Sequence, residues 1–147
     1  MGYNQALSAY RETRVRTASQ GTLIVMLYDE AIRQIGEAIA LIDGDFKKEP
    51  SRIERCNTHI IKSQEIITEL MASLDMEAGG EIAKNLLSLY TYFNQQLFEA
   101  NMEKKADKML AVRDLMEQLR AAWNEIVSTN ATPRAVQSAP AGINIAG

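Results

Sequence analysis

The side chains best suited to nucleophilic chemistry are His59 and Cys56, the only histidine and the only cysteine of the chain. They are three residues apart, a spacing that on a helix places both on one face, where a histidine can activate a thiolate. Cys56 also falls on an apolar helical stripe. This pattern favours an inert core cysteine, with His59 at the surface or at the boundary of the core.

No other catalytic or metal-binding motif accompanies this pair. A Ser-His-Asp triad would have to use His59, and the sequence has no Gly-x-Ser-x-Gly elbow. No glutamate is followed three residues later by a histidine, so the di-iron site found in some helical bundles lacks its ligands. Glu65 and Glu69 share a helix face with Lys62, which is typical of weak surface ion pairs. We therefore expect no enzymatic activity, no metal and no cofactor.

The composition indicates a single all-α domain. Of the 147 residues, 46% are hydrophobic but only 6% are aromatic, and residues that favour helices dominate. The net charge of −3 disfavours nucleic-acid binding. The single cysteine suits a reducing compartment, and the sequence shows neither a signal peptide nor an apolar run of about 18 residues. We expect a cytosolic protein without membrane insertion.

Apolar residues recur at helical spacing in four segments. The expected helices cover approximately residues 20–42, 50–74, 81–102 and 107–128, with Ser19 as the first cap and Pro50 at the first position of the second helix. Gly79-Gly80 predicts a turn. Because the connections are short, neighbouring helices must run antiparallel, which predicts an up-down four-helix bundle over residues 19–128. Residues 1–18 form a separate N-terminal segment, and residues 129–147 have the composition of a flexible, disordered tail.

The helices carry more apolar surface than a simple bundle needs. The apolar positions of the third helix spread over about half of its circumference, and the first helix is similarly broad. Burial by loops or tails, self-association and a groove for another chain are three explanations. Several apolar residues are candidates for the groove or the core: Tyr28, Ile61, Ile66, Leu86, Leu87, Tyr90, Phe93 and Leu97. Tyr3, Leu7 and Tyr10 recur at helical or turn spacing and predict a short segment that covers such a groove as a removable lid.

An ordered set of short matches resembles one known family, the flagellin export chaperones (flagellar secretion chaperone, FliS). The matches are Ala9-Tyr10, Thr17-Ala18-Ser19, Leu23 to Asp29, Ala31-Ile32, Leu70 to Asp75, Gly79 to Ala83, Leu86, Leu89-Tyr90, Ala100-Asn101, Leu110, Leu119 and Ala122-Trp123. They extend over about residues 3–128. Two positions depart from the family pattern: Gln20 replaces a proline, and Glu30 replaces a glycine, a change that bears on close packing at that point.

The resemblance implies an antiparallel four-helix bundle that binds the C-terminal segment of flagellin in the cytosol. It further implies that the bundle prevents premature polymerisation of flagellin and delivers it to the flagellar type III export apparatus. By matching position, Tyr10 is the best candidate for the lid or the client groove, and packing of Tyr10 on its own bundle is the alternative. Trp123 is assigned to the core.

A second hypothesis from a different class is a structural helical bundle that associates with itself through the same broad faces, without a client. We expect a monomer or a weak homodimer. A metal-dependent bundle enzyme is disfavoured by the missing ligands.

Overall fold

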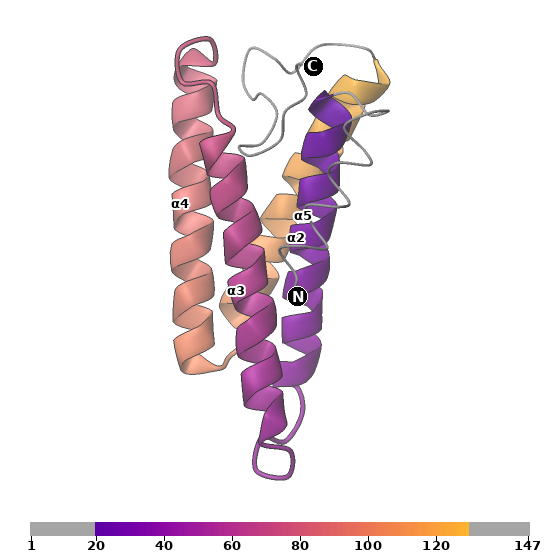
Figure 1. The fold of residues 1–147 in the computed structure, drawn as a ribbon, viewed down its shortest axis with the longest axis vertical. Helices are drawn as coiled ribbons and strands as arrows, with labels where there is room; N and C mark the ends of the chain where they lie inside the picture. The colour runs from indigo at the N-terminus through magenta and orange to yellow at the C-terminus, as the bar shows by residue number, and fades with distance from the viewer. Residues whose placement is uncertain (1–19, 130–147) are drawn as a thin grey trace, which may run out of the picture.

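A computed structural model describes residues 20–129, which form four α-helices and their connections (Figure 1). The helices are α2 (Gln20–Ile42), α3 (Ser51–Ala72), α4 (Gly80–Glu103) and α5 (Asp107–Ser128), and the described residues contain no strand. Each helix packs against the next one along the chain, and α5 closes the ring against α2. The predicted up-down four-helix bundle is therefore confirmed. The predicted lid, the Ser19 cap and all of the predicted tail except Thr129 lie outside the described residues.

The connections end the helices close to the predicted positions. Pro50 was expected as the first residue of the second helix; instead α3 begins at Ser51 and Pro50 is its N-cap. Gly80 has a φ of 53°, a conformation that is easily adopted without a β-carbon, and it starts α4 directly after the tight connection. At the other end of α4, Lys104 is left-handed and its N–H donates to the Ala100 carbonyl at 2.8 Å.

Helix α2 is the most deeply buried of the four, although its apolar face is broad. It packs more extensively against α3 and α5 than α4 does against its two neighbours. Its large apolar side chains are buried or partly buried, and none of them belongs to the exposed set. The width of the first apolar face therefore does not indicate a free surface, because the neighbouring helices enclose it. The buried apolar residues of α2 are Leu23, Ile24, Val25, Leu27, Tyr28, Ala31, Ile35, Ala38 and Ile39.

The core contains a hydrogen bond between two fully buried hydroxyl groups, those of Tyr28 on α2 and Tyr90 on α4. The two rings lie 6.3 Å apart at a tilt of 54°, and Tyr90 continues the aromatic contact to Phe93 at 6.4 Å. Burial raises the pKa of Tyr28 to about 12, against the opposing effect of hydrogen bonds with Tyr90 and Trp123. Trp123 is buried as predicted. These aromatic groups connect α2, α4 and α5 inside the ring.

We predict that Tyr28→Phe lowers the free energy of unfolding by about 1–2 kcal/mol, because it deletes one partner of a buried hydrogen bond without opening a large cavity. Tyr90→Phe has a similar effect, and the double variant loses less than the sum of the two single losses because both changes remove the same bond. Urea unfolding followed by circular dichroism measures all four proteins. Strictly additive losses would show that the two hydroxyls are not coupled.

Candidate binding surface

The structure divides the predicted groove-or-core residues into two groups. Six of them are buried and belong to the core: Tyr28, Ile66, Leu86, Tyr90, Phe93 and Leu97. Leu87 is partly buried, and Ile61 is 42% exposed. Only Ile61 and Leu87 are therefore available to a partner in this conformation. Tyr3, Leu7 and Tyr10 lie outside the described residues.

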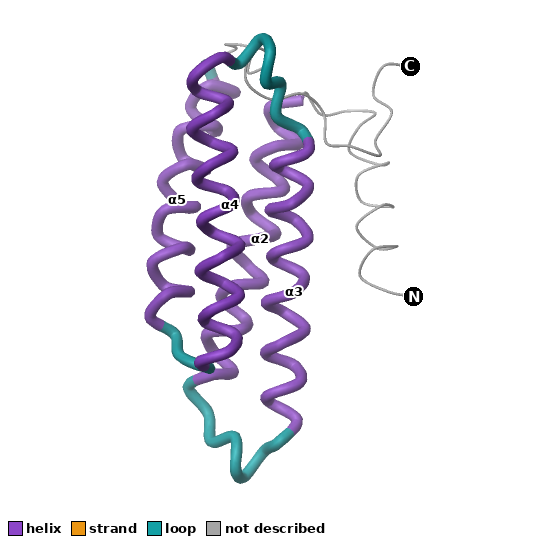
Figure 2. Tube along the Cα trace, turned by 90° about the vertical axis from the view of Figure 1, so that its left-hand side faces the viewer, coloured by secondary structure: helices purple, strands orange, loops and turns teal. Residues whose placement is uncertain are grey.

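The most exposed large apolar side chains lie on α4, and none of them was among the residues predicted for the groove or the core. Figure 2 shows α4 in front of the ring, between α5 and α3, with α2 behind it. Met102 is 71% exposed and Phe98 is 54% exposed, and Ile82 and Tyr92 are also exposed. The sequence indicated this surface only through the width of the third apolar face, which spreads over about half of the helix circumference. A helix with two neighbours cannot bury such a wide face. Four of the nine exposed large hydrophobic residues among residues 20–129 belong to this helix.

The seam between α3 and α4 is closed by hydrogen bonds between polar side chains. Asn101 Nδ2 donates to Asn57 Oδ1 at 2.5 Å, and Gln64 Nε2 donates to the Asn94 carbonyl at 3.1 Å. Asn94 Nδ2 also donates to Thr68 Oγ1 at 3.2 Å. The bonded pairs 57/101 and 64/94 are two helical turns apart on both helices, so they fix the antiparallel register of this seam.

Ion pairs between side chains join α4 to α5 at one end of the two helices. Lys108 Nζ lies 2.6 Å from Glu99 Oε1 and 3.2 Å from Glu103 Oε2. The hydrogen bond from Lys108 lowers the pKa of Glu99, and the hydrogen bond to Glu99 raises the pKa of Lys108. Both side chains are about one-third exposed, so water screens this pair, and it contributes register more than stability. The packing of α4 on α5 is the least extensive of the four helix pairings in the ring.

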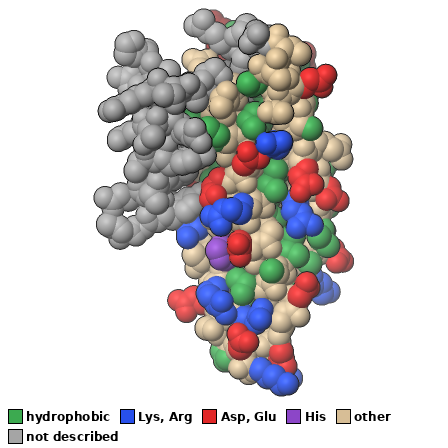
Figure 3. Space-filling model, turned by 90° about the vertical axis from the view of Figure 1, so that its right-hand side faces the viewer, with side chains coloured by type: hydrophobic (Ala, Val, Ile, Leu, Met, Phe, Trp, Pro, Cys, Tyr) green, Lys and Arg blue, Asp and Glu red, His purple; other side chains and the backbone are tan. Residues whose placement is uncertain are grey.

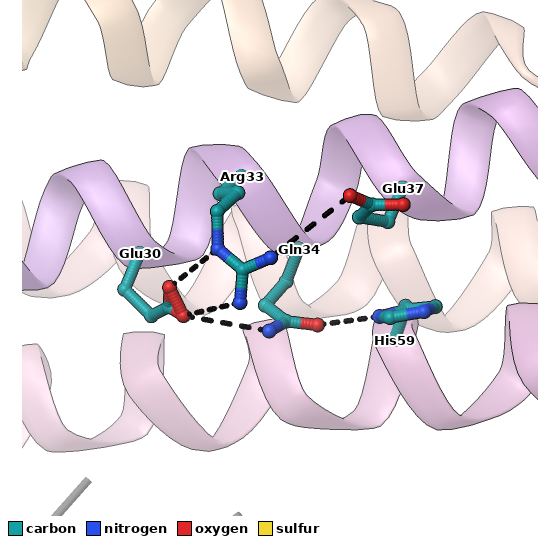
Figure 4. A network of polar contacts seen from close by, with 5 residues as sticks. All are labelled: Glu30, Arg33, Gln34, Glu37 and His59. Atoms are coloured by element: carbon teal, nitrogen blue, oxygen red, sulfur yellow. Dashed lines mark hydrogen bonds and ion pairs between the residues drawn. The ribbon is translucent and has the colours of Figure 1, made fainter.

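A polar network joins α2 to α3 on the opposite side of the bundle (Figure 4). Glu30 accepts two hydrogen bonds of 2.8 Å from Arg33, which lower the pKa of Glu30. Gln34 is buried, and it accepts a hydrogen bond from His59 Nδ1 at 2.6 Å in the tautomer that carries this proton. Glu30 therefore does not disturb the packing of the neighbouring helices, because its carboxylate turns along α2 to Arg33.

Cys56 and His59 do not form a catalytic pair. The Cys56 thiol is buried and donates to the Ala38 carbonyl, with an Sγ–O distance of 3.7 Å, whereas His59 turns to Gln34. Burial raises the pKa of Cys56, which disfavours the reactive thiolate. Among residues 20–129, no group of three or more histidine, cysteine, aspartate or glutamate side chains could hold a metal ion. The same stretch has no helix that combines the length and the apolar character needed to span a bilayer.

The side of the molecule in Figure 3 carries acidic and basic side chains that alternate along its length, with small hydrophobic patches between them. An ion pair joins α2 to α5, between Arg120 Nε and Asp29 Oδ1 at 2.6 Å. Exposed pairs of this kind contribute little stability individually.

The fold and this surface define a helical bundle that presents apolar side chains to a partner, without catalytic groups in its described part. The family model "Flagellar protein FliS" matches residues 3–130, and the chain belongs to this family. It is therefore a flagellar secretion chaperone and not an enzyme.

Individual relatives carry the same name over nearly their whole lengths. The flagellar secretion chaperone FliS of Salmonella typhimurium is 34% identical over 78% of this chain and 82% of its own. The Campylobacter jejuni protein of that name is 32% identical over 86% and 94% of the two chains. The Bacillus subtilis protein of that name is 28% identical over 91% and 95%.

The polar network predicts a pH dependence of stability that depends on His59. Desolvation lowers the pKa of His59 in the folded protein, against the opposing effect of the Glu37 carboxylate. As the pH falls below about 6.5, the unfolded chain therefore takes up the proton first, and the folded state loses stability until the pH is below the folded pKa.

The measurement is urea unfolding of the wild type and of His59→Gln at a series of pH values from about 8 to 5. The glutamine keeps an amide donor for Gln34 and does not titrate, so we expect a flatter profile for the variant in this window. Parallel profiles of the two proteins would contradict the prediction.

Proposed function

We propose that this protein is a cytosolic export chaperone for flagellin. It binds the C-terminal segment of flagellin, prevents its premature polymerisation and delivers it to the flagellar type III export apparatus. The observation that supports this proposal most directly is the gathering of four exposed large apolar side chains on one helix, α4, because exposed apolar surface concentrated on one element is typical of a binding site for another chain. Family membership supports the same role.

The exposed apolar side chains of α4 indicate what kind of client segment the protein would bind. The terminal segments of flagellin are amphipathic and bury one another only in the filament, so a monomer before export exposes apolar side chains. A helix with exposed residues such as Tyr92, Phe98 and Met102 supplies substitute apolar contacts. Binding of this kind needs no turnover, no metal and no cofactor.

Isothermal titration calorimetry with the C-terminal segment of the cognate flagellin tests this function. We expect one-to-one binding with an increase in helicity by circular dichroism, because an unfolded segment orders on the bundle. A segment of the same composition in scrambled order is the control. Absence of binding to the cognate segment, together with a mass that rises with protein concentration, would instead support the self-associating structural bundle.

The N-terminal segment supplies a second test. We propose that Tyr3, Leu7 and Tyr10 belong to the lid or to the client groove, and Tyr10 is the best candidate by its match to the family. Tyr10→Asp places a charge in an apolar contact of a peripheral segment, so it weakens client binding by roughly tenfold while leaving the melting temperature nearly unchanged. Tyr10→Phe is the matched control, because it retains the ring. Equal losses of affinity and melting temperature for Tyr10→Asp would place Tyr10 in the bundle core instead.

A further inference from the structure

The first part of α4 buries less apolar surface than the rest of this helix. We name residues 80–89 the entry segment of α4; its buried side chains are those of Ala83 and Leu86, and Leu86 remains 9% exposed. The second part, residues 90–103, contains four fully buried residues, three of them large: Tyr90, Phe93, Leu97 and Ala100. Because the stabilisation from docking grows with the apolar area removed from water, the entry segment is held more weakly than the second part.

The interhelical polar contacts described above all involve the second part of α4. They are the Tyr28–Tyr90 hydrogen bond, the bonded amides at 57/101 and 64/94, and the Glu99–Lys108 ion pair. The entry segment has an ion pair within its own helix, in which Lys84 Nζ lies 3.6 Å from Glu81 Oε1. A pair at this spacing supports the helix itself but does not hold it against a neighbouring helix.

The entry segment also extends past the end of a neighbouring helix. Eight residues lead forward from Gln64 to Ala72, the last residue of α3, and back from Asn94 to Leu86. Ala72 and Leu86 therefore lie at the same level, because the two helices run antiparallel. Residues 80–85 reach beyond the end of α3, as Figure 1 shows. The helix that accompanies them is α5, and the α4–α5 pairing is the least extensive of the ring.

The entry segment lies level with the only tryptophan of the chain, Trp123 on α5. Fifteen residues lead back from Glu99 to Lys84 and forward from Lys108 to Trp123, so the Glu99–Lys108 pair places Lys84 and Trp123 at one level. Trp123 is only 5% exposed, and its indole shares a hydrogen bond with the Tyr28 hydroxyl. A displacement of the entry segment therefore uncovers this end of the core.

We infer that the entry segment is a movable cover of the bundle, which swings away from α5 as a unit while the second part of α4 stays docked. Tyr90 is the boundary, because its hydroxyl is bonded to Tyr28 inside the core. The chain can accommodate the motion at the other end: residues 73–79 connect the segment to α3, and a β-carbon at Gly80 would meet nothing within 4 Å. The inference concerns the bundle alone and does not rest on the proposed function.

The motion changes what one end of the bundle presents to water without unfolding the rest. Helix α2 packs extensively on α3 and α5, so these three helices stay together when the entry segment moves. In the closed form Ala83, Leu86 and Trp123 are buried, and in the open form they face solvent. The bundle can therefore expose additional apolar surface at this end reversibly.

Two fully buried alanines of α4, Ala83 and Ala100, provide matched positions for a test. Ala83→Cys and Ala100→Cys, each in full-length protein that also carries Cys56→Ala, place a single thiol in the entry segment or in the second part. An aromatic disulfide reagent labels such a thiol only when its surroundings open. The native Cys56 of the wild type, which is buried between α2 and α3, is the reference. Urea unfolding shows that each variant is folded.

We expect the thiol at position 83 to be labelled at least about tenfold faster than the thiol at position 100 and than Cys56 of the wild type. Exchange of the Trp123 indole N–H, followed by nuclear magnetic resonance, measures the same opening in the unmodified protein. It should be at least about tenfold faster than expected from global unfolding. Equal labelling at positions 83 and 100, together with indole exchange at the rate of global unfolding, would overturn the inference.

Two buried leucines of α4 test whether the opening stops at Tyr90. Leu86→Ala removes contacts that exist only in the closed form, so it should accelerate labelling at position 83 by at least about tenfold. Leu97→Ala destabilises the open and closed forms alike, so it should change this rate by less than about threefold while lowering stability to urea. Equal acceleration by the two substitutions would show that labelling requires unfolding of the whole helix, which contradicts a separate entry segment.

Discussion

The hydrogen bond between Tyr28 and Tyr90 is the interaction on which the arrangement of the bundle depends most. It joins two helices that are not neighbours along the chain, inside a core where both hydroxyl groups have lost water. A buried hydroxyl without a partner costs more than a hydrogen bond contributes, so each tyrosine fixes the position of the other. Helix α4 is thereby held at one depth and rotation, which determines which of its side chains face outward.

The unequal packing of the helices explains why the exposed apolar surface is concentrated on α4. Helix α2 is enclosed by extensive contacts with α3 and α5, whereas α4 packs less extensively against both of its neighbours. With Tyr90 and Phe93 directed into the core, Tyr92 and Phe98 must lie on the two flanks, because successive residues of a helix turn by about 100°. The surface offered to a partner is thus a consequence of the same geometry that builds the core.

Apolar periodicity predicted the four helices to within a few residues and assigned Cys56 and Trp123 correctly to the core. Periodicity gave only the width of the third apolar face, not its orientation in the ring. Tyr90 and Phe98 look equivalent as apolar residues, yet one is buried and the other is exposed. The Tyr28–Tyr90 bond and the Asn57–Asn101 bond decide this difference, and each connects residues that are more than 40 positions apart. Spacing within one helix contains no information about such pairs.

The distribution of charge around the exposed apolar groups suits a chaperone that must bind its client without binding itself. Large continuous apolar patches favour association between copies, whereas apolar groups limited by polar and ionic neighbours give each copy few contacts with another. A long flexible client can instead collect many such contacts in succession and add their small energies. On one side of α4, the Glu99–Lys108 ion pair interrupts the apolar surface between α4 and α5. On the other side, the hydrogen-bonded amides between α3 and α4 interrupt it. Selectivity for a flexible, amphipathic segment over a second folded bundle then follows from the arrangement of these groups.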